Sequence, residues 1–263
     1  MKSRILLWGL LLLASCQLSE DVSVTLPPQQ PNFVVEAILR PGMPMELMLL
    51  ESSQLKGVVS RSYVKDAFAC FVLGGDTIKL KYQFYTRADD KMTVNYTSKV
   101  LLPNSESGRL RLYIRKGGDT LTAEAQFIKP VAIRACAVDG VSVDATVANT
   151  FGDDDRFFQL HAYLYLQKKW IGRYSRIYDL RDNRTEELPL HLEVENIPRD
   201  SVKVVVWHIS RQYYEYIYTC IRSLEAYHDL YTVPTPIKTN IFGGVGVFTV
   251  VAEDKRAMRS VYP

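Results

Sequence analysis

The stretch RLRLYIRKGGDTLTAEAQFI, residues 109–128, decides the fold class. In its first part, apolar residues alternate with polar or aromatic ones, which is the two-residue period of a β-strand with one buried face. Residues 116–119 (KGGD) supply the glycines and aspartate of a tight turn, and the alternation resumes from Leu121. The sequence therefore predicts an antiparallel β-hairpin here.

Similar short apolar runs, bounded by turn residues, occur on both sides of this hairpin. The run TIKLKYQF (residues 77–84) alternates after a Gly74-Gly75-Asp76 turn, and AFACFVL (residues 67–73) is apolar throughout, as in a strand buried on both faces. Further predicted strands are residues 33–38, 45–50, 157–170, 188–194, 202–209 and 245–252. The run 157–170 is one long strand or a bent pair. Many short strands separated by turns are typical of β-sandwiches.

We predict a mainly β protein with two regions. Residues 33–135 form an immunoglobulin-like or carboxypeptidase-regulatory-like β-sandwich, and residues 136–263 form a second β-region. The second region contains one amphipathic helix at about residues 210–227, which Ser210 can cap at its N-terminus. Apolar residues recur there every three or four positions and define the face expected to be buried. These residues are Ile217, Cys220, Ile221, Leu224 and Tyr227.

The composition is that of a folded protein without a strongly charged surface. Apolar residues make up 47% of the 263 residues and charged residues 23%, which excludes disorder for most of the length. The net charge of +3 falls to +1 without the first fifteen residues, because they contain Lys2 and Arg4. We expect no nucleic-acid partner, since phosphate recognition needs concentrated positive charge.

The N-terminus has the organisation of a lipoprotein signal. Lys2 and Arg4 precede an apolar run, residues 5–14, which is shorter than the roughly 20 apolar residues of a membrane-spanning helix. The run ends at Leu13-Ala14-Ser15-Cys16, which resembles the bacterial lipobox, whose cysteine is acylated and becomes the mature N-terminus.

We therefore expect residues 1–15 to be a cleaved signal peptide and Cys16 to carry the fatty acyl chains. Residues 16–32 are polar and proline-rich and should form a flexible tether. An ordinary secretory signal with an incidental cysteine is the alternative. The pair Glu20-Asp21 resembles the surface-export signal of Bacteroidota lipoproteins, which implies a protein anchored in the outer membrane and exposed at the cell surface. A solvated linker is the alternative reading of this pair.

The segment PIKTNIFGGVGVF, residues 236–248, resembles the C-terminal signature of a Bacteroidota lipoprotein family known only as a domain of unknown function. In that family a proline segment leads to Thr-Asn-Ile, a Gly-Gly pair and Gly-aromatic-Phe. The matching residues here are Thr239, Asn240, Ile241, Gly243, Gly244, Gly246 and Phe248. Val247 departs from the family's usual tyrosine.

Members of that family are usually encoded beside a TonB-dependent outer-membrane receptor. The resemblance therefore implies an accessory lipoprotein of a nutrient-uptake complex, with the receptor as partner, an unidentified cargo ligand, and no catalytic residue carried over. The signature also has a structural interpretation, because glycine permits positive φ or the close approach of another backbone. Asn240 can cap a turn through its side chain. We expect a structural turn that closes the sandwich.

The residues give no pattern for catalysis or metal binding. The histidines at 161, 191, 208 and 228 lack metal-ligand spacing, and there is no nucleophile elbow, phosphate-binding loop or dinucleotide fingerprint. His161 and His208 fall within predicted strands, where core or sheet-surface roles are expected. We predict a non-enzymatic binding protein without metal or cofactor. The alternatives are a surface adhesin, fimbria-like subunit or carbohydrate-binding module, and a hydrolase whose site the sequence does not reveal.

Several polar residues and cysteines have both a functional and a structural interpretation. Thr77, Thr120 and Ser201 each follow an aspartate and precede an apolar residue, which resembles the O-glycosylation sequon of exported Bacteroidota proteins and also suits plain turns. Residues 153–155, three consecutive aspartates, offer oxygen ligands for Ca²⁺ or a solvated turn, and we favour the turn. Cys70 and Cys136 form a disulfide in one interpretation and remain buried thiols in the other.

Three tyrosines begin the predicted helix. Tyr213 and Tyr216 are three residues apart and can form a neighbouring pair, whereas Tyr214 falls in line with Ile217. We therefore expect Tyr214 to be buried. We hypothesise that Tyr213 and Tyr216 form a binding face with residues 235–242, because tyrosine suits a partly wet interface. Packing of both rings against the adjoining sheet is the alternative.

Overall fold

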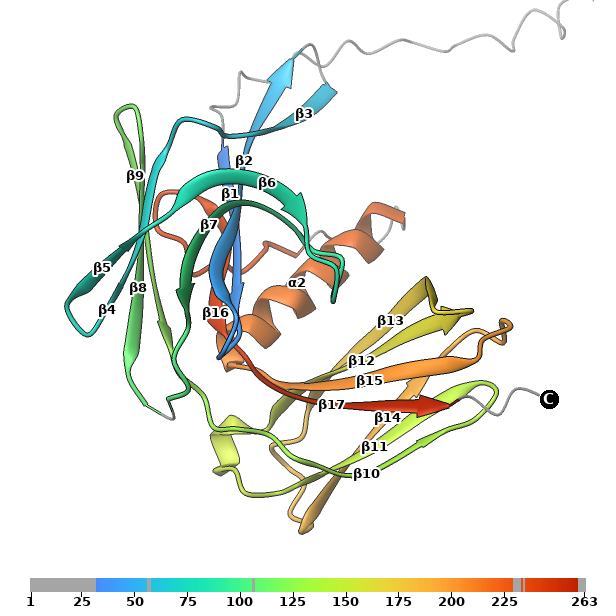
Figure 1. Ribbon diagram of the computed structural model, residues 1–263. Helices are drawn as coiled ribbons and strands as arrows, with labels where there is room; N and C mark the ends of the chain where they lie inside the picture. Colours follow the sequence, from blue (N-terminus) through green and yellow to red (C-terminus); the bar gives the residue numbers. More distant parts are fainter. Residues whose placement is uncertain (1–31, 56–57, 106, 229–232, 234, 260–263) are drawn as a thin grey trace, which may run out of the picture.

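The computed structural model describes residues 32–55, 58–105, 107–228, 233 and 235–259. Two β-sandwiches lie next to one another, and the single long helix of the described residues, α2 (Arg211–His228), lies at their junction (Figure 1). The prediction of a mainly β protein with one such helix is confirmed. The expectations for the signal peptide, Cys16 and the tether fall outside the described residues.

The first sandwich packs a six-stranded sheet against a four-stranded one. The larger sheet has the order β16-β1-β2-β7-β6, with β3 paired to β2, and the smaller has the order β5-β4-β8-β9. Phe71 and Phe248 stack between the two sheets with ring centroids 5.5 Å apart. The strands are β1 (Asn32–Leu39), β2 (Pro44–Leu55), β3 (Val58–Tyr63), β4 (Phe68–Leu73), β5 (Asp76–Lys79), β6 (Lys81–Thr86), β7 (Thr93–Leu101), β8 (Arg109–Lys116), β9 (Asp119–Gln126) and β16 (Val245–Val250).

The second sandwich packs a three-stranded sheet, β10-β11-β14, against a four-stranded sheet, β13-β12-β15-β17. Apolar side chains from both sheets form its core. A short 3-10 turn, Asp153–Asp155, precedes β12. The strands are β10 (Ile133–Val138), β11 (Ser142–Ala148), β12 (Phe157–Leu166), β13 (Lys169–Asp179), β14 (Glu187–Glu193), β15 (Ser201–His208) and β17 (Ala252–Arg259).

A third apolar core joins the two sandwiches, because β1 and β12 are covered on both faces. Successive side chains of a strand point to opposite faces. On β12, Phe158 and Leu160 belong to the core of the second sandwich, whereas Phe157 and Tyr163 face the junction. On β1, Ile38 faces the same junction, between neighbours that belong to the first core.

The C-terminal segment crosses between the sandwiches, which corrects the predicted domain organisation. Strand β16 pairs in parallel with β1, from Val34 opposite Val245 to Leu39 opposite Val250. After Val251 the chain enters β17, which pairs with β15 in the second sandwich. The single strand predicted for residues 245–252 is therefore wrong, and so is the assignment of all residues after 135 to the second region. The apolar run was continuous because both strands are buried.

One other run is divided differently from the prediction, and in another the structure has the second of the two forms that were expected. Residues 77–84 form two strands, β5 and β6, which lie in opposite sheets of the first sandwich with buried Leu80 between them. Residues 157–170 form most of a hairpin, in which Gln167 and Lys168 adopt positive φ between β12 and β13. The turns predicted at Gly74-Gly75 and Gly117-Gly118 are confirmed.

Helix α2 begins as predicted but buries a different face. The Ser210 hydroxyl accepts a hydrogen bond from the Tyr213 backbone N–H at 3.2 Å, as a capping residue does. Ile221 and Leu224, expected in the core, are 44% and 61% exposed. Thr219 and Ala226 are buried instead, while Ile217 and Cys220 are half-buried; the side chain of Tyr227 lies outside the described residues.

The burial of the three tyrosines also differs from the prediction, because α2 buries a different face. Tyr213 is 4% exposed and packs in the junction core, so it does not form an exposed binding face. Tyr216 is half-buried against the same core. Tyr214, expected to be buried, is only half-buried and stacks on Tyr218 with ring centroids 6.1 Å apart. The alternative is confirmed for Tyr213, because its ring packs against the adjoining strands in the junction core.

The cysteines of the described chain are free thiols. Cys70 lies in the first sandwich and Cys136 in the second, and they form no disulfide. Burial raises the pKa of the Cys70, Cys136 and Cys220 thiols. These side chains therefore act as small packing groups rather than as reactive thiolates.

The signature segment ties the two sheets of the first sandwich together. The Asn240 side chain accepts a hydrogen bond from the Phe248 N–H (2.9 Å) and donates one to the Phe248 carbonyl (2.7 Å), as a neighbouring strand would. The Thr239 hydroxyl donates to the Gly246 carbonyl at 2.8 Å. The backbone of Phe242 pairs in both directions with Thr122 of β9. This is the structural role expected from the sequence.

The signature glycines sit where another backbone approaches closely. A Cβ atom on Gly246 would lie 1.9 Å from the Val35 carbonyl oxygen of β1, and Gly246 has a φ of +127°. A Cβ atom on Gly243 would lie 2.5 Å from the Thr120 carbonyl oxygen. Only glycine fits such positions without displacing the backbone. The parallel β1–β16 pairing therefore requires Gly246.

The first prediction concerns Gly246→Ala. Both the contact with Val35 and the positive φ oppose a side chain, so we expect the free energy of unfolding to fall by more than about 2 kcal/mol. Urea unfolding measures the change. Gly118→Ala is the control, because nothing lies within 4 Å of a Cβ atom there; its effect should stay within about 0.5 kcal/mol. Equal stability of the two variants would contradict the assigned role of Gly246.

Candidate functional site

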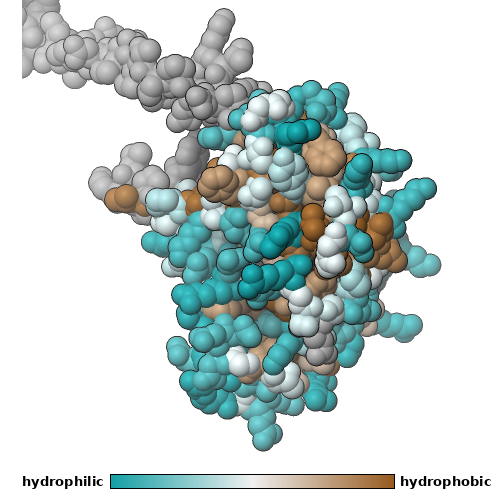
Figure 2. Space-filling view, turned by 90° about the vertical axis from the view of Figure 1, so that its left-hand side faces the viewer, coloured by the Kyte–Doolittle hydropathy of each residue, from teal (hydrophilic) through white to brown (hydrophobic). Residues whose placement is uncertain are grey.

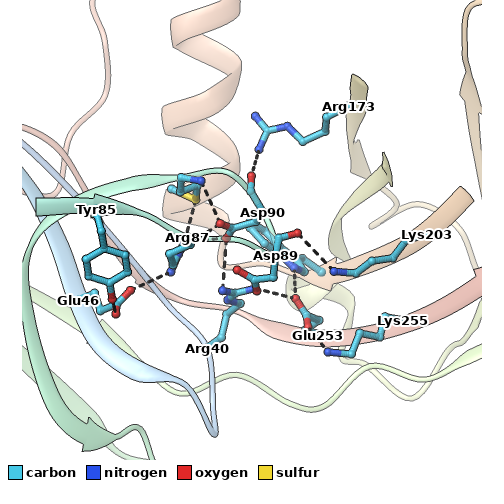
Figure 3. A network of polar contacts seen from close by, with 12 residues as sticks. Arg40, Glu46, Tyr85, Arg87, Asp89, Asp90, Arg173, Lys203, Glu253 and Lys255 are labelled. Carbon is cyan, nitrogen blue, oxygen red and sulfur yellow. Dashed lines mark hydrogen bonds and ion pairs between the residues drawn. The ribbon is translucent and has the colours of Figure 1, made fainter. Parts of the chain in front are cut away.

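The tip of the β6–β7 hairpin, residues 87–92, reaches from the first sandwich onto the second (Figure 3). The Asp89 carbonyl accepts a hydrogen bond from Lys203 of β15 at 3.4 Å, and the Asp90 carbonyl accepts one from Arg173 of β13 at 3.5 Å. The hairpin tip is thus held by cations of the second sandwich at the entrance to the junction.

Buried ion pairs fix this tip from the other side. Arg40, at the end of β1, pairs with Asp89 at 2.7 Å, with Asp90 at 3.3 Å and with Glu253 of β17 at 3.3 Å. Arg87 pairs with Asp90 at 2.7 Å. Buried charges are costly unless they are paired. The network therefore specifies one relative position for β1, the hairpin tip and β17.

Burial and ion pairing have opposite effects on the pKa values of Asp89, Glu253 and Glu46. Burial alone would raise the pKa of Asp89 and of Glu253, but the neighbouring donors outweigh it and lower both. For Asp89 the donor is Arg40, and for Glu253 they are Trp207 and Arg40. Burial dominates at Glu46, whose pKa is raised although Arg87 lies nearby. Asp89 and Glu253 therefore ionise more readily than Glu46.

A polar cavity of about 190 Å³ lies beside this network, between the two sandwiches. Its walls come from β1, β2, β12, β13, β15, the β6–β7 hairpin and the start of α2. Apolar side chains such as Ile38 and Met92 complete the lining. The polar and aromatic residues that line it are Glu36, Gln159, His161, Arg173, Trp207 and Tyr213.

Two buried side chains in this cavity have unused hydrogen-bonding atoms. Gln159 is 7% exposed and His161 is 2% exposed. The Gln159 Oε1 atom and both ring nitrogens of His161 have no hydrogen-bond partner within the part of the chain that the structure describes. Buried polar side chains are nearly always hydrogen-bonded. The cavity is therefore prepared for a group that the chain does not supply.

The ring of His161 is uncharged at neutral pH. Burial, with smaller contributions from Arg173 and Arg40, lowers the pKa of His161 to about 3. A neutral imidazole offers one N–H donor and one acceptor nitrogen. The ring lies edge-on to Trp207, with centroids 4.4 Å apart, and the Trp207 N–H is held by Glu253 at 3.0 Å.

Glu36 brings a carboxyl group to the same cavity from β1. It is half-buried, and burial raises its pKa despite the opposing charges of Arg87 and Arg173. The pKa of Tyr213 is raised well above its ordinary value, first by burial and then by the nearby Glu36. The cavity thus presents a carboxyl group, a guanidinium group and two neutral polar side chains.

A second surface feature lies on the outer face of the β5-β4-β8-β9 sheet. Figure 2 shows apolar side chains gathered among hydrophilic ones on this side of the molecule. A hollow of about 440 Å³ is lined there by Val72, Tyr113 and Phe242, among others. Phe242 is 79% exposed, and Phe68 on β4 is exposed as well. We call Phe68, Val72, Tyr113 and Phe242 the outer patch.

The predicted modification sites lie at strand ends. Thr77 and Thr120 are exposed next to the β4–β5 and β8–β9 turns, and Ser201 is half-buried at the start of β15. The Ser201 hydroxyl donates a hydrogen bond to the Asp200 carboxylate at 2.8 Å. O-glycosylation at these three residues stays a prediction.

The aspartate run before β12 is tied to arginines. Asp153 pairs with Arg184 and, at 2.8 Å, with Arg156. Arg184 above all, with a smaller contribution from Arg156, lowers the pKa of Asp153 against the opposing effect of burial. No group of three or more histidine, cysteine, aspartate or glutamate side chains in the described residues could hold a metal ion. His208 is buried, with its ring nitrogens 2.8 Å and 2.6 Å from the carbonyls of Lys129 and Asp155.

The sequence patterns did not indicate the junction cavity or its ion-pair network. The placement of His161 within a strand is correct, but the pattern did not show that both faces of β12 are covered. One signal was available: Gln159 and His161 occupy alternate positions of an otherwise mostly apolar run. Residues 87–90 (RADD) resemble any solvated turn.

The geometry defines a two-sandwich β protein with a polar cavity at the junction. The chain belongs to the family described as a domain of unknown function, DUF4249, which matches residues 19–257.

No curated protein matches the chain. No helix in the described segments is long and apolar enough to cross a lipid bilayer.

The second prediction concerns the pH dependence of Glu36→Gln. Because the pKa of Glu36 is raised in the folded state, its ionisation costs stability. That cost is absent below the unfolded-state pKa of about 4 and complete above the folded-state pKa. We expect the variant to melt at a higher temperature than the unchanged chain at about pH 7, with the gap closing towards about pH 4.

Thermal unfolding at several pH values measures this gap. Glu124→Gln is the matched control, because Glu124 is exposed and pairs with Arg111 on the surface. Exposed pairs contribute little, so this control should not gain stability as the pH rises. A gap for Glu36→Gln that does not change with pH would show that the Glu36 charge carries no folding penalty.

Proposed function

We propose that this protein is a lipid-anchored outer-membrane protein, exposed at the cell surface, that acts as a non-enzymatic accessory of a TonB-dependent uptake system. The lipobox-like sequence that ends at Cys16 supports the anchor, and Glu20-Asp21 supports surface display. The signature at residues 236–248 and the family membership support the link to a receptor through the resemblance described above.

The outer patch is the structural observation that carries the proposal. Large exposed apolar groups that cluster on one face mark contacts with other macromolecules. Phe242 is fixed by two backbone hydrogen bonds to Thr122, so its ring is presented from a rigid backbone. Ordering such a residue on binding costs little entropy, and aromatic residues often dominate interface energies. We assign the outer patch to the receptor contact.

A surface adhesin, a fimbria-like subunit or a carbohydrate-binding module would use an exposed β-sandwich face in the same way. The receptor is preferred because the signature segment both resembles the receptor-linked family and carries Phe242. The alternatives predict a different partner: another surface subunit or a glycan. Identification of the partner therefore separates these functions.

The third prediction tests the anchor. In Cys16→Ala the acyl acceptor is lost, so the protein should remain an uncleaved precursor or leave the membrane fraction. Fractionation and mass spectrometry of the N-terminus measure both outcomes. Ser15→Ala is the control, because a small residue before the cysteine is retained. Unchanged processing and membrane attachment of Cys16→Ala would refute lipidation at this residue.

The fourth prediction tests the receptor contact. Phe242→Glu places a charge in the outer patch and should reduce recovery of a TonB-dependent receptor with the purified protein by at least about tenfold. Recovery is measured by affinity purification from solubilised outer membranes and mass spectrometry. Phe84→Glu is the matched control, since Phe84 is exposed on β6, outside the patch. It should leave recovery unchanged.

Two results would count against the receptor assignment. One is that no receptor of this class accompanies the unchanged chain from its native membrane. The other is that both phenylalanine variants recover it equally. Recovery of fimbria-like subunits alone would favour the adhesin alternative.

A further inference from the structure

We propose that the junction cavity binds a small, uncharged polyhydroxylated molecule, of the size of a monosaccharide or smaller. The inference goes beyond the proposed function, because it depends neither on the lipid anchor nor on a receptor. It rests on the size of the cavity, the unpartnered buried polar atoms that line it, and the balance of charge around it.

Size sets the upper limit. The cavity volume of about 190 Å³ corresponds to roughly six water molecules at about 30 Å³ each. Pockets for drug-sized ligands span roughly 300–1,000 Å³. A peptide or an oligosaccharide would extend beyond the cavity, whereas a single small ring or short polyol fits within it.

The unused atoms set the hydrogen-bonding pattern of the ligand. The Gln159 Oε1 atom accepts only, and the neutral His161 ring offers one donor and one acceptor. Glu36, on β1, adds carboxyl oxygens to the lining. A hydroxyl group both donates and accepts, so adjacent hydroxyls can satisfy all of these groups at once. A purely apolar ligand would leave them unpaired at a cost.

The charges around the cavity favour a neutral ligand. The ionisable residues of its lining are one carboxyl group, Glu36, one guanidinium group, Arg173, the uncharged His161 and the phenol of Tyr213. The neighbouring Arg87 and Asp90 neutralise one another in a close ion pair. A cation would therefore meet Arg173 and an anion would meet Glu36, and each would also lose hydration on entry.

The site is held rigidly, as binding sites need to be. Gln159 and His161 project from the central strand β12, and Glu36 projects from β1. Trp207 is fixed by its hydrogen bond to Glu253, which also pairs with Arg40. Apolar side chains such as Ile38 and Met48 supply the surface on which the C–H groups of a polyol can pack. Side chains on strands keep their geometry better than those on loops.

The fifth prediction is that the purified protein without residues 1–15, which contain Trp8, binds neutral polyols without a receptor. Trp207 lines the cavity, so its fluorescence should change saturably as the ligand is added. Trp170→Phe serves as the background, because it removes the exposed Trp170 emission from the second sandwich. The titrated probes are xylose, glucose, galactose, mannose and myo-inositol, in a detergent without a sugar headgroup. Glucosamine, glucuronate and the zwitterion alanine are the charged probes.

We expect saturation with at least one neutral probe and at least tenfold weaker affinity for its charged analogues. Gln159→Leu and His161→Phe should each weaken that binding by at least tenfold, because each removes unpaired atoms from the site. Gln126→Leu, at an exposed position of β9, is the matched control and should not change it. Gln159→Glu keeps acceptor oxygens at this position, so it should bind more tightly than Gln159→Leu.

Three outcomes of these titrations would overturn the proposal. It fails if no neutral probe gives a saturable signal, if a charged or zwitterionic probe binds best, or if Gln159→Leu binds like the control. Because a receptor is absent from the assay, these outcomes do not depend on whether the outer patch contacts one.

Discussion

The parallel pairing of β1 with β16 is the interaction on which the rest of the structure depends. It closes the larger sheet of the first sandwich with a strand that comes from the far end of the chain. One residue later the same chain begins β17 and completes the second sandwich. This connection joins the two sandwiches in addition to the connection from β9 to β10 and the one from β15 through α2 to β16. Gly246 makes the pairing sterically possible.

This crossing creates an interior that neither sandwich has alone. The outer faces of β1 and β12 are brought together and sealed by Tyr213 and Trp207, so polar side chains on those faces become buried. The ion pairs of Arg40 and Arg87 contribute less to stability than their number suggests, because burying each charge is costly. Their effect is to set the relative position of the sheets, which in turn shapes the cavity.

The two surfaces assigned to binding depend on the same segment for different reasons. The signature residues Thr239 and Asn240 bond to β16 and hold the backbone from which Phe242 extends outwards. On the inner side, β16 supplies Val247 to the junction core next to the cavity. A change that loosens this segment should therefore affect both sites, whereas changes at Phe242 or Gln159 should affect one each.

The sequence by itself determined the local structure. Alternation and turn glycines predicted the strands and hairpins around Leu112, Ser210 marked the start of the helix, and the glycine-rich signature indicated close backbone contact, because each of these depends on neighbouring residues alone. Only the tertiary structure decided that residues 245–252 divide between two sandwiches, that Ile221 and Leu224 face solvent, and that Gln159 and His161 line a cavity. These outcomes depend on which distant strand covers each face. Hydrophobic periodicity shows that a face is buried, but it does not show what covers it.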